Sequence, residues 1–420
     1  MDHYVLRDSY LNKLIVRRDN GEVKVITGPR RSGKSFLLDP IYKDYLLGQG
    51  VPEDHIISIS FDIEDENTPK ELLDRDKLKE YLYSRITSNE DSYYVFLDEI
   101  QEVDDFERIV NGLNKRDNVD VYVTGSNSKF LSSDINTLFR GRGDEVSVRP
   151  FTFKEFIQGR SEPVNELWKE YYTYGGLPAL RKMPTPEQKI AYLQRLWKKT
   201  YIDDVVERHH VENREALEAI ADALCSSIGS LTNTTKITNI LSSVRHIKIT
   251  DDTVAKYIGY LEDAFLFTEA RRYNIKGNKY YENIKKYYSV DLGLRNARLN
   301  FRQQEISHIM ENVIFNELVC RGYAVDVGVV EHRKKVDDQY KYFQYEVDFI
   351  ATNGSDKYYI QSAFEMSTEE KKEQELNSLT RIGDSFRKIV IEGADILSYT
   401  DDKGIQHMGL FQFLQNDSLR

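Results

Sequence analysis

The sequence of 420 residues has few cysteines, no long apolar run and no excess of positive charge. Its two cysteines, Cys225 and Cys320, exclude a disulfide framework or a cysteine zinc site and fit a reducing, cytoplasmic compartment. Apolar runs such as residues 93–97 are only strand-sized, and the first ten residues lack the apolar core of a signal peptide, so we expect no membrane partner. The net charge of −11 means that any contact with nucleic acid must be local.

The most informative stretch is a glycine-rich segment between two apolar runs. Residues 23–27 are β-branched and predict a strand, whereas residues 35–47 predict a helix. The segment between them fits the pattern GxxxxGK[ST] with Gly28, Pro29, Arg30, Arg31, Ser32, Gly33, Lys34 and Ser35. Glycines let backbone amides surround phosphate oxygens, the lysine reaches the β- and γ-phosphates, and the serine hydroxyl binds Mg²⁺. The pattern therefore predicts a nucleotide-binding site, and a plain glycine turn with a surface lysine is the alternative.

A second candidate element lies at the end of the apolar strand 93–97. Asp98 follows the strand directly and is placed to hold Mg²⁺ beside Ser35. Glu99 comes next, where a carboxylate can orient or deprotonate the attacking water. The alternative is a strand that ends in a solvated acidic turn with no catalytic role. Together with the glycine-rich segment, the pair favours catalysis.

Three further polar residues are candidates for catalysis. Asn127, or its neighbour Ser126, follows the strand 119–124 and could sense the γ-phosphate if the strands are neighbours. Arg140 and Arg142 flank a glycine further on. A guanidinium group is planar and always charged, so either arginine could act as a finger on the phosphate, in the same chain or from a neighbouring subunit. An ordinary turn and two surface charges are the alternatives.

The first part of the chain alternates strands with helices. This pattern is typical of an α/β fold, a doubly wound parallel sheet with helices on both faces. The expected strands are residues 23–27, 56–61, 93–97 and 119–124. The glycine-rich segment follows the first of them, at the carboxyl edge where such sheets bind ligands.

Several of these motifs together resemble a known family. The stretches GPRRSGKS, YYVFLDEIQ, VTGSNS and FRGRGDEVSVRPFTFKEF, in this order, resemble bacterial and archaeal AAA-type P-loop ATPases. With YYTYGGLPAL at residues 171–180, they are similar to a subgroup that carries a C-terminal domain of unknown function. The resemblance implies ATP as the nucleotide, Mg²⁺ as its metal and probable hydrolysis. It leaves the oligomeric state open, so a homo-oligomer or another protein partner is possible.

The remaining patterns predict four segments. The last two are named by their similarity to known modules, a winged helix-turn-helix and a restriction-endonuclease-like fold. The segments are residues 1–155 for the ATPase domain, 156–215 for a helical lid or linker, 216–300 for the winged helix and 301–420 for the nuclease-like region.

Three short helices followed by two strand-like runs indicate the winged helix, a frequent DNA-binding module. Its hairpin has a net charge of +5 over residues 271–288, with interleaved tyrosines. The candidate contacts to duplex DNA are Arg271, Arg272, Lys276, Lys279, Lys285 and Lys286. A protein-docking module with a solvated hairpin is an equally weighted alternative.

The last segment is similar to the restriction-endonuclease-like core, with Glu311 on a helix, Asp348 on a strand and Gln361 on the next strand. Such centres hold Mg²⁺ with acids and place a lysine near the nucleophile. Here Gln361 replaces the second acid and Ala363 stands in place of the lysine, although Lys388 could substitute from a neighbouring strand. We therefore expect an inactive nuclease-like fold.

These features favour an ATPase whose nucleotide state repositions the C-terminal region, associated with DNA. An ATP-gated, metal-dependent nuclease and a nucleotide-dependent protein-interaction switch without DNA are the alternatives. The missing lysine argues against the nuclease, and the positive hairpin weakly favours DNA over the protein switch.

Overall fold

The computed structural model describes residues 4–62, 69–125, 137–336, 339–416 and 418–419. The chain forms two compact units, residues 1–150 and 151–420. The boundaries predicted after residues 215 and 300 both fall inside the second unit, and the four-part division stays a prediction. No helix in the described ranges is long and apolar enough to cross a bilayer.

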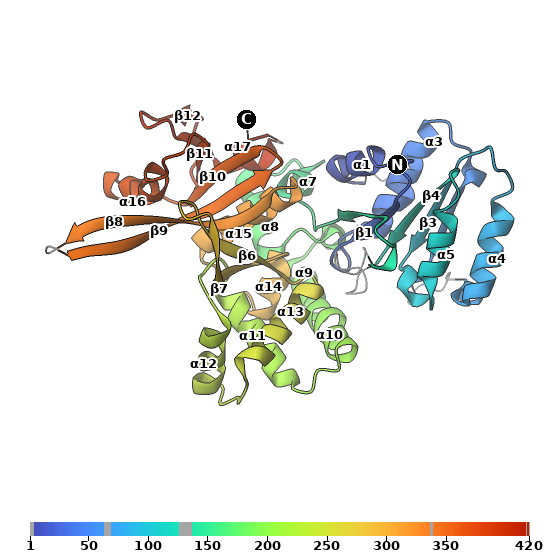
Figure 1. The fold of residues 1–420 in the computed structure, drawn as a ribbon, viewed down its shortest axis with the longest axis horizontal. Helices are drawn as coiled ribbons and strands as arrows, with labels where there is room; N and C mark the ends of the chain where they lie inside the picture. The colour runs from blue at the N-terminus through green and yellow to red at the C-terminus, as the bar shows by residue number, and fades with distance from the viewer. Residues whose placement is uncertain (1–3, 63–68, 126–136, 337–338, 417, 420) are drawn as a thin grey trace. The chain divides into compact units, whose positions relative to one another are not determined.

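The first unit is the predicted parallel sheet with helices on both faces (Figure 1). Its main elements are α1 (Asp8–Ile15), β1 (Val23–Thr27), α2 (Lys34–Phe36), α3 (Lys43–Gly48), β2 (Ile56–Ser60), α4 (Arg75–Arg85), β3 (Tyr93–Asp98), α5 (Phe106–Leu113), β4 (Val119–Thr124) and β5 (Gly143–Ser147). The strand order is β2-β3-β4-β1-β5, and all neighbours are parallel. Strand β5 is missing from the sequence-based expectation because its sequence, GDEVS, is mostly polar.

Two apolar cores cover the two faces of this sheet. Val23 and Val25 of β1 pack in the core that also contains residues of α4 and α5. Ile26, on the other face, packs with residues of α1 and α3. Strands buried on both faces are apolar nearly throughout, and this is why the central strands are visible in the sequence.

The helix predicted for residues 35–47 is wrong as a single helix. The short α2 ends at Phe36, a π-helical turn spans Leu37–Tyr42, and α3 begins at Lys43. Asp39, which precedes Pro40, has φ −134° and ψ 110°, outside the helical region. Proline disfavours the helical conformation of the residue before it and cannot donate a backbone hydrogen bond, so the helix is interrupted there.

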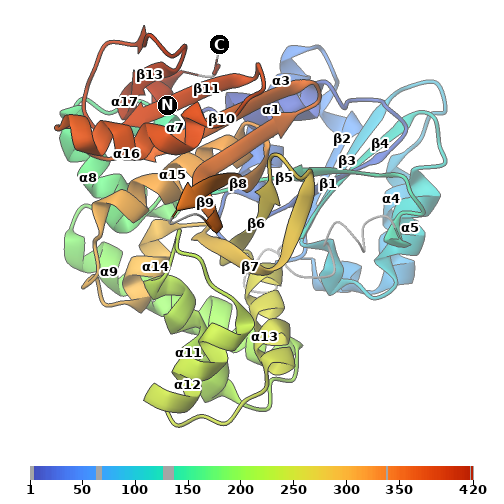
Figure 2. The same ribbon diagram turned by 60° about the vertical axis from the view of Figure 1, so that its left-hand side comes forward.

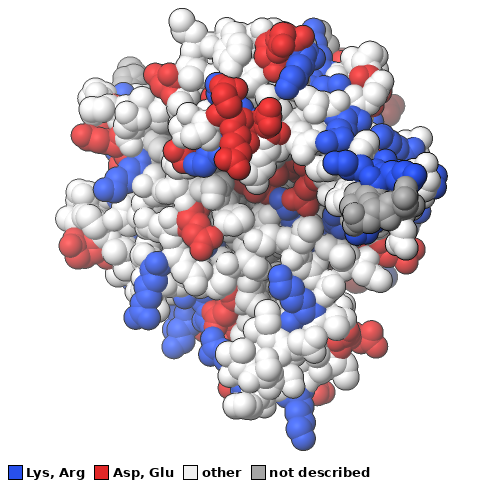
Figure 3. Space-filling model, turned by 90° about the vertical axis from the view of Figure 1, so that its left-hand side faces the viewer, with Lys and Arg blue, Asp and Glu red and all other residues white. Residues whose placement is uncertain are grey.

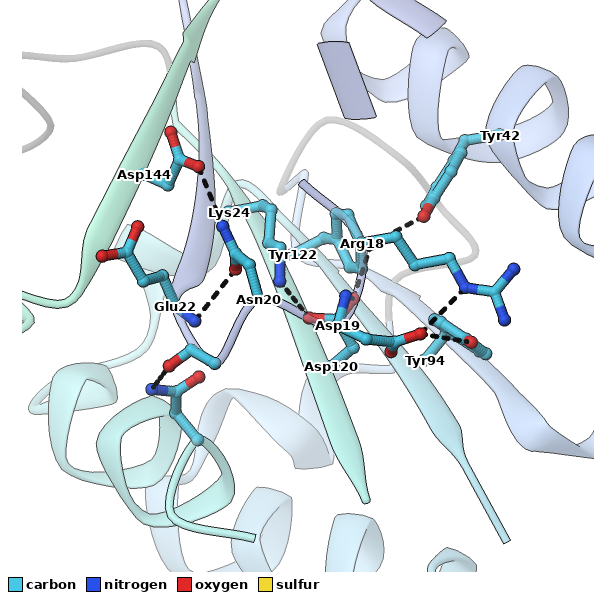
Figure 4. A network of polar contacts seen from close by, with 12 residues as sticks. Arg18, Asp19, Asn20, Glu22, Lys24, Tyr42, Tyr94, Asp120, Tyr122 and Asp144 are labelled. Carbon is cyan, nitrogen blue, oxygen red and sulfur yellow. Dashed lines mark hydrogen bonds and ion pairs between the residues drawn. The ribbon is translucent and has the colours of Figure 1, made fainter. Parts of the chain in front are cut away.

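A buried polar network ties β1 to β4 near the amino ends of the two strands (Figure 4). Lys24 of β1 forms a buried ion pair with Asp120 of β4. Asp120 also accepts hydrogen bonds from the Tyr122 hydroxyl at 2.7 Å and from the backbone amide of Asp19 at 3.0 Å. Since every member has a partner, the network can fix the position of β1 without leaving an unpaired charge in the core.

The second unit combines a helical layer with a mixed sheet. Its helices are α7 (Phe153–Ile157), α8 (Val164–Tyr174), α9 (Pro186–Arg195), α10 (Asp203–Arg208), α11 (Arg214–Ser226), α12 (Thr234–Val244), α13 (Asp251–Asp263), α14 (Leu292–Arg298), α15 (Ile306–Cys320), α16 (Glu369–Thr380) and α17 (Leu410–Gln415). Its strands are β6 (Phe267–Asn274), β7 (Lys279–Ser289), β8 (Ala324–Val336), β9 (Gln339–Asn353), β10 (Asp356–Ala363), β11 (Arg387–Glu392), β12 (Tyr399–Thr400) and β13 (Gln406–Gly409). The sequence predicts most of these elements.

The hairpin of the predicted winged helix and the strands of the nuclease-like region belong to one sheet. Its strand order is β12-β13-β11-β10-β9-β8-β6-β7. The joining pair is parallel, with Arg272 opposite Val327 and Asn274 opposite Val329, and Figure 2 shows β6 beside β8. One apolar core also extends from Leu177 to Ala297, across the boundary predicted after residue 215.

The YYTYGGLPAL motif is a packing joint between α8 and α14. Gly176 donates its amide to the carboxylate of Asp291 at 2.8 Å, and Asp291 also caps α14 through the amide of Leu294. Burial raises the pKa of Asp291 to about 6, although backbone amides favour its charged form. A Cβ atom on Gly293 would lie 1.8 Å from the carbonyl oxygen of Tyr174, so only glycine fits this approach.

We expect Gly293→Ala to lower the free energy of unfolding by about 2 kcal/mol or more, because the added methyl group forces α8 and α14 apart. Thermal unfolding of the full chain would measure the effect. Gly259→Ala in α13 is the matched control, because nothing lies within 4 Å of its Cβ position, and alanine there should raise helix stability slightly. Equal unfolding temperatures for Gly293→Ala and Gly259→Ala would contradict the close packing of α8 against α14 at Gly293.

Candidate nucleotide-binding site

The glycine-rich segment, residues 28–35, connects the carboxyl end of β1 to the start of α2, as predicted. Gly28 has φ +135°, and a Cβ atom there would lie 2.0 Å from the carbonyl oxygen of Val148. Gly33 has φ +91° and immediately precedes α2. Both positions require glycine for conformational or steric reasons, so the two glycines of the motif are explained by the local backbone.

The side chain of Lys34 is buried beside this segment. Its Nζ donates hydrogen bonds to the carbonyl oxygens of Gly28 and Pro29, both at 3.1 Å. Burial lowers the pKa of Lys34, and the carboxylates of Glu99 and Asp98 oppose that shift. A negatively charged ligand bound beside the ammonium group would therefore favour its charged form.

Ser35 and Asp98 meet at the carboxyl edge of the sheet. Ser35 Oγ donates to Asp98 Oδ1 at 2.9 Å, and Asp98 also accepts from Thr124 Oγ1 at 2.6 Å and from Ser60 Oγ at 3.1 Å. Burial raises the pKa of Asp98, while the three hydroxyl donors pull it down. Hydroxyl and carboxylate oxygens are ligands that suit Mg²⁺.

These residues fit Mg²⁺ held jointly with a nucleotide rather than by a cage of protein side chains. Within the part of the chain that the structure describes, no group of three His, Cys, Asp or Glu side chains is arranged to hold a metal ion. Mg²⁺ commonly takes one or two protein ligands and fills the rest of its shell with phosphate oxygens and water. The hydroxyl of Ser32, buried and without a hydrogen-bond partner among the described atoms, is a further polar group available to a phosphate.

Glu99 follows Asp98 in a left-handed backbone conformation, with φ 53°. Its amide donates to Thr124 Oγ1 at 2.9 Å, and its carboxylate accepts from Gln101 Nε2 at 2.5 Å. Two contacts thus hold Glu99 next to the Ser35–Asp98 pair. The sequence predicts Glu99 as a candidate but does not indicate the roles of Thr124 and Gln101.

Arg7 supports the site and has no signal in the sequence. Its side chain is buried, donates to the carbonyl oxygen of Ser32 at 2.9 Å and to that of Arg149 at 2.8 Å, and lies 4.4 Å from the ring centroid of Tyr10. Arg7 therefore joins the glycine-rich segment to the chain that follows β5. It precedes α1 by one residue and belongs to no recognisable motif.

The remaining predicted catalytic residues have different outcomes. Asn127 lies outside the described residues. Arg140 and Arg142 are exposed and precede β5. They lie at the edge of the sheet where β1 begins, because Val23, the first residue of β1, pairs with Gly143. The amide of Val23 also donates to the carbonyl oxygen of Arg142 at 2.8 Å. The glycine-rich segment starts at the other end of β1, roughly 15 Å away along five residues. A role for either arginine in its own site is thus disfavoured, and a role in a neighbouring subunit stays a prediction.

The predicted DNA contacts of the β6–β7 hairpin need correction. Arg272 and Lys286 are buried and cannot contact DNA. Lys285 forms a 2.5 Å ion pair with Glu269. Arg271, Lys276 and Lys279 are exposed, and the guanidinium of Arg271 lies 4.1 Å from the ring centroid of Tyr280. The net charge of +5 counted along the sequence is therefore not a single positive surface.

Lys286 lies at the centre of the nuclease-like residues. Its Nζ is 2.8 Å from Glu311 Oε1, 2.9 Å from Glu346 Oε1 and 3.7 Å from Asp348 Oδ1. Burial alone would lower the pKa of Lys286, but the three carboxylates outweigh it and raise the pKa strongly. In an active nuclease a metal ion lies among such acids, and here the ammonium group of Lys286 takes that position.

The other nuclease-like residues are also engaged within the fold. The side chain of Gln361 donates from Nε2 to Glu375 Oε2 at 3.1 Å, and its Oε1 accepts from the backbone amide of Asp348 at 3.4 Å. Lys388, the lysine considered as a substitute, donates to the carbonyl oxygen of Ile382 at 2.9 Å and is not part of the centre. The sequence pattern predicts Glu311 and Asp348 as neighbours but gives no signal that Lys286 of β7 and Glu346, two residues before Asp348 on β9, belong to the same cluster.

Comparison with known proteins defines the class. A sequence model described as an AAA domain matches residues 20–157, the range that contains the glycine-rich segment, Asp98 and Glu99. A second model, described as a domain of unknown function (DUF8612), matches residues 165–305. With the order β2-β3-β4-β1-β5, the first unit is an AAA-type P-loop ATPase domain.

Two relatives span nearly the whole chain. A protein of Haemophilus influenzae, described as uncharacterized, is 35% identical over 394 residues, 93% of each chain. One of Methanocaldococcus jannaschii, described in the same way, is 29% identical over 397 residues, 91% of this chain and 83% of its own. The chain belongs to this family of bacterial and archaeal proteins, in which an AAA domain is joined to a C-terminal domain of unknown function.

Among solved structures, the Aeropyrum pernix ORC1 protein in complex with DNA is similar over 71% of this chain and 94% of its own, with 14% sequence identity. The TM-score is 0.29, which is too low to support an argument about this chain.

Proposed function

We propose that the chain binds ATP with Mg²⁺ at residues 28–35 and Asp98 and hydrolyses the ATP. The observation that carries the proposal is the 2.9 Å contact between Ser35 Oγ and Asp98 Oδ1, next to the buried ammonium group of Lys34. A serine of the glycine-rich segment and a strand-end aspartate are the pair that holds Mg²⁺ in P-loop ATPases. ATP rather than GTP is proposed from the family alone.

The chain's own residues would supply positioning and charge. Ser35 and Asp98 would hold Mg²⁺, which when bound would supply positive charge beside the phosphate oxygens of the nucleotide. Lys34 would donate to the same oxygens, and the backbone amides of the glycine-rich segment would surround them. Glu99, held by Thr124 and Gln101, would accept a proton from the attacking water or orient it. Such positioning and electrostatic stabilisation account for most of the catalysis in phosphoryl transfer.

We expect Glu99→Gln to bind ATP normally but to lose turnover by about 10²- to 10⁴-fold, the usual contribution of a general base. Phosphate release would measure turnover, and thermal stabilisation by ATP would measure binding. Glu102→Gln is the matched control, because Glu102 is exposed and lies three residues further along. Full activity of Glu99→Gln would remove Glu99 from catalysis.

We further propose that the nucleotide state repositions the second unit and that the protein associates with DNA. The exposed Arg271, Lys276 and Lys279 support such an association. In an oligomer, Arg140 or Arg142 would act as a finger on the neighbouring subunit's phosphate. ATP turnover measured with and without DNA tests the coupling, since a DNA-associated ATPase should respond to DNA and a protein switch should not.

The protein-interaction switch is the second candidate, and one observation favours it. Helix α13, the third helix of the predicted winged helix, begins with Asp251 and Asp252. Two acids at the start of a helix would repel the phosphates of a DNA groove, although they suit the helix dipole. The third candidate, an ATP-gated nuclease, is disfavoured because Lys286 occupies the acidic centre. Cleavage of a plasmid with Mg²⁺ or Mn²⁺ would test it.

A further inference from the structure

The outer half of the β8–β9 hairpin has no role in the ATPase proposed above. We call residues 331–336 of β8 and 339–344 of β9 the ribbon. The inner half of the hairpin pairs with β6 and β10, whereas within the described strands the ribbon residues pair only with one another. Figure 1 shows this hairpin projecting from the sheet of the second unit. A two-stranded ribbon by itself is only marginally stable in water, so a ligand bound along it would also stabilise it.

One face of the ribbon combines aromatic rings with cations. Arg333 pairs with Tyr342, and Lys335 pairs with Tyr340, so these four side chains share a face. The guanidinium of Arg333 lies 3.8 Å from the ring centroid of Tyr340 and 5.9 Å from that of Tyr342. Tyr340 is 58% exposed and Tyr342 is 69% exposed. Two exposed rings on the same face are available to stack on flat ligand groups.

The charge of the ribbon contrasts with that of the whole protein. Lys334 pairs with Lys341 on the opposite face, and two like charges facing each other are destabilising until an anion relieves them. Figure 3 shows a gathering of Lys and Arg side chains on the face of the molecule toward which this hairpin projects. Asp337 and Asp338 lie outside the described residues. Among the described residues of the ribbon, the four cations Arg333, Lys334, Lys335 and Lys341 stand against one acid, Glu331.

The base of the same face is closed by hydrogen bonds. Glu331, opposite Gln344, accepts from the hydroxyl of Tyr281 at 2.7 Å, and Gln344 donates to that hydroxyl at 3.2 Å. The carboxylate of Glu331 is thus engaged with Tyr281 rather than with the cations further out. The basic and aromatic face therefore begins at Arg333 and continues outward.

We propose that the ribbon binds single-stranded DNA, with the rings of Tyr340 and Tyr342 stacked on bases and Arg333 and Lys335 against phosphates. Lys334 and Lys341, on the opposite face, add to the positive charge that attracts the strand. Stacking on exposed aromatic side chains requires bases whose faces are free, as in a single strand, whereas a duplex would use only the charge. This inference deepens the proposed association with DNA and moves it from the β6–β7 hairpin to the ribbon. It requires neither ATP binding nor hydrolysis.

Fluorescence anisotropy of a labelled oligothymidylate with the full chain, without nucleotide, tests the proposal. We expect saturable binding that is tighter than for a duplex of the same length. The double variant Tyr340→Ala and Tyr342→Ala should bind about 10-fold or more weakly, whereas Tyr→Phe at both positions should bind as the natural chain does, because phenylalanine still stacks. Arg333→Ala with Lys335→Ala should also reduce the dependence of affinity on salt, by about 0.7 in the log–log slope for each phosphate that the variant no longer neutralises.

The variant Lys77→Ala with Lys79→Ala is the matched control, because it removes two exposed cations from α4 and leaves the ribbon intact. We expect it to keep its affinity for the oligothymidylate. The proposal is overturned if the natural chain shows no saturable binding, if the tyrosine-to-alanine variant binds normally, if the control variant alone loses binding, or if polyglutamate competes as well as the oligothymidylate. ATP turnover of the ribbon variants, measured in parallel, separates a failure of this inference from a failure of the ATPase proposal.

Discussion

Lys34→Ala should abolish ATP hydrolysis and weaken ATP binding by about 100-fold or more. The removed ammonium would otherwise donate to two phosphate oxygens, and each hydrogen bond to a charged group contributes about 1.5–3 kcal/mol. The protein without ATP should lose little stability in this variant. Burial disfavours the charged form of Lys34 and lowers its pKa, so the ammonium group is costly to keep without a bound nucleotide. Its ammonium group donates hydrogen bonds to two backbone carbonyl oxygens, those of Gly28 and Pro29. The variant should therefore fold normally and fail only with the ligand.

Titration with labelled ATP and Mg²⁺ and the thermal shift caused by ATP measure this effect. A ligand at 100 times its dissociation constant stabilises the folded state by about 2.7 kcal/mol, so loss of affinity should remove the shift. Lys43→Ala is the matched control, because Lys43 lies in α3 of the same unit and pairs with the exposed Glu53 at 3.2 Å. Unchanged affinity in Lys34→Ala would refute the nucleotide site, and with it the central part of the proposed function.

Lys286→Met should destabilise the second unit by about 3–5 kcal/mol. Removing one partner of a buried ion pair leaves the remaining charge uncompensated, and here three carboxylates share the one ammonium. Burial raises the pKa of Asp348, and the charge of the neighbouring Glu311 raises it further, whereas Lys286 lowers it. Without Lys286, these buried carboxylates would repel one another with no cation to offset their charge. The variant should unfold at a clearly lower temperature than the natural chain.

Divalent cations provide the second measurement for this variant. The three carboxylates are not arranged as a metal site while Lys286 lies among them, but without its ammonium group they are available to a cation. We therefore expect Mg²⁺ or Mn²⁺ to raise the unfolding temperature of Lys286→Met more than that of the natural chain. Lys285→Met is the matched control, because the adjacent lysine pairs with Glu269 where both side chains are about one-third exposed, and such pairs contribute at most about 1 kcal/mol. Metal-dependent DNA cleavage by the natural chain, lost in Asp348→Asn, would contradict the interpretation that lysine replaces the metal.

The residues of the candidate nucleotide site could be predicted because their chemistry is local. Two glycines, a lysine and a serine at fixed spacing follow a β-branched strand, and the strand that ends in Asp98 is apolar throughout. Arg7 and Gln101 could not be predicted, since a supporting hydrogen bond to a backbone carbonyl or a carboxylate requires no particular sequence pattern. The ion pair between Lys24 and Asp120 could not be predicted either, because each is a single polar residue within an apolar strand and the two lie 96 residues apart in the sequence.

The hairpin of residues 271–288 shows the limit of counting charges along the chain. Neighbouring residues on a strand point to opposite faces, and two of its six cations, Arg272 and Lys286, are buried. Lys285 remains near the surface, whereas Lys286 enters the acidic centre. The extent of β8 and β9 was likewise missed, because their outer halves are polar and aromatic and bury no continuous apolar face.

The amino-acid sequence by itself determined the parallel sheet of the first unit, the glycine-rich segment and the acidic end of β3, because apolar periodicity and short-range backbone requirements are written in neighbouring residues. Only the tertiary structure decided which charges are exposed, which lysine meets the acids of the nuclease-like centre and where the arginines before β5 lie. Those outcomes depend on strand register and on contacts between residues distant in the chain, and a single step in register reverses the face of every side chain.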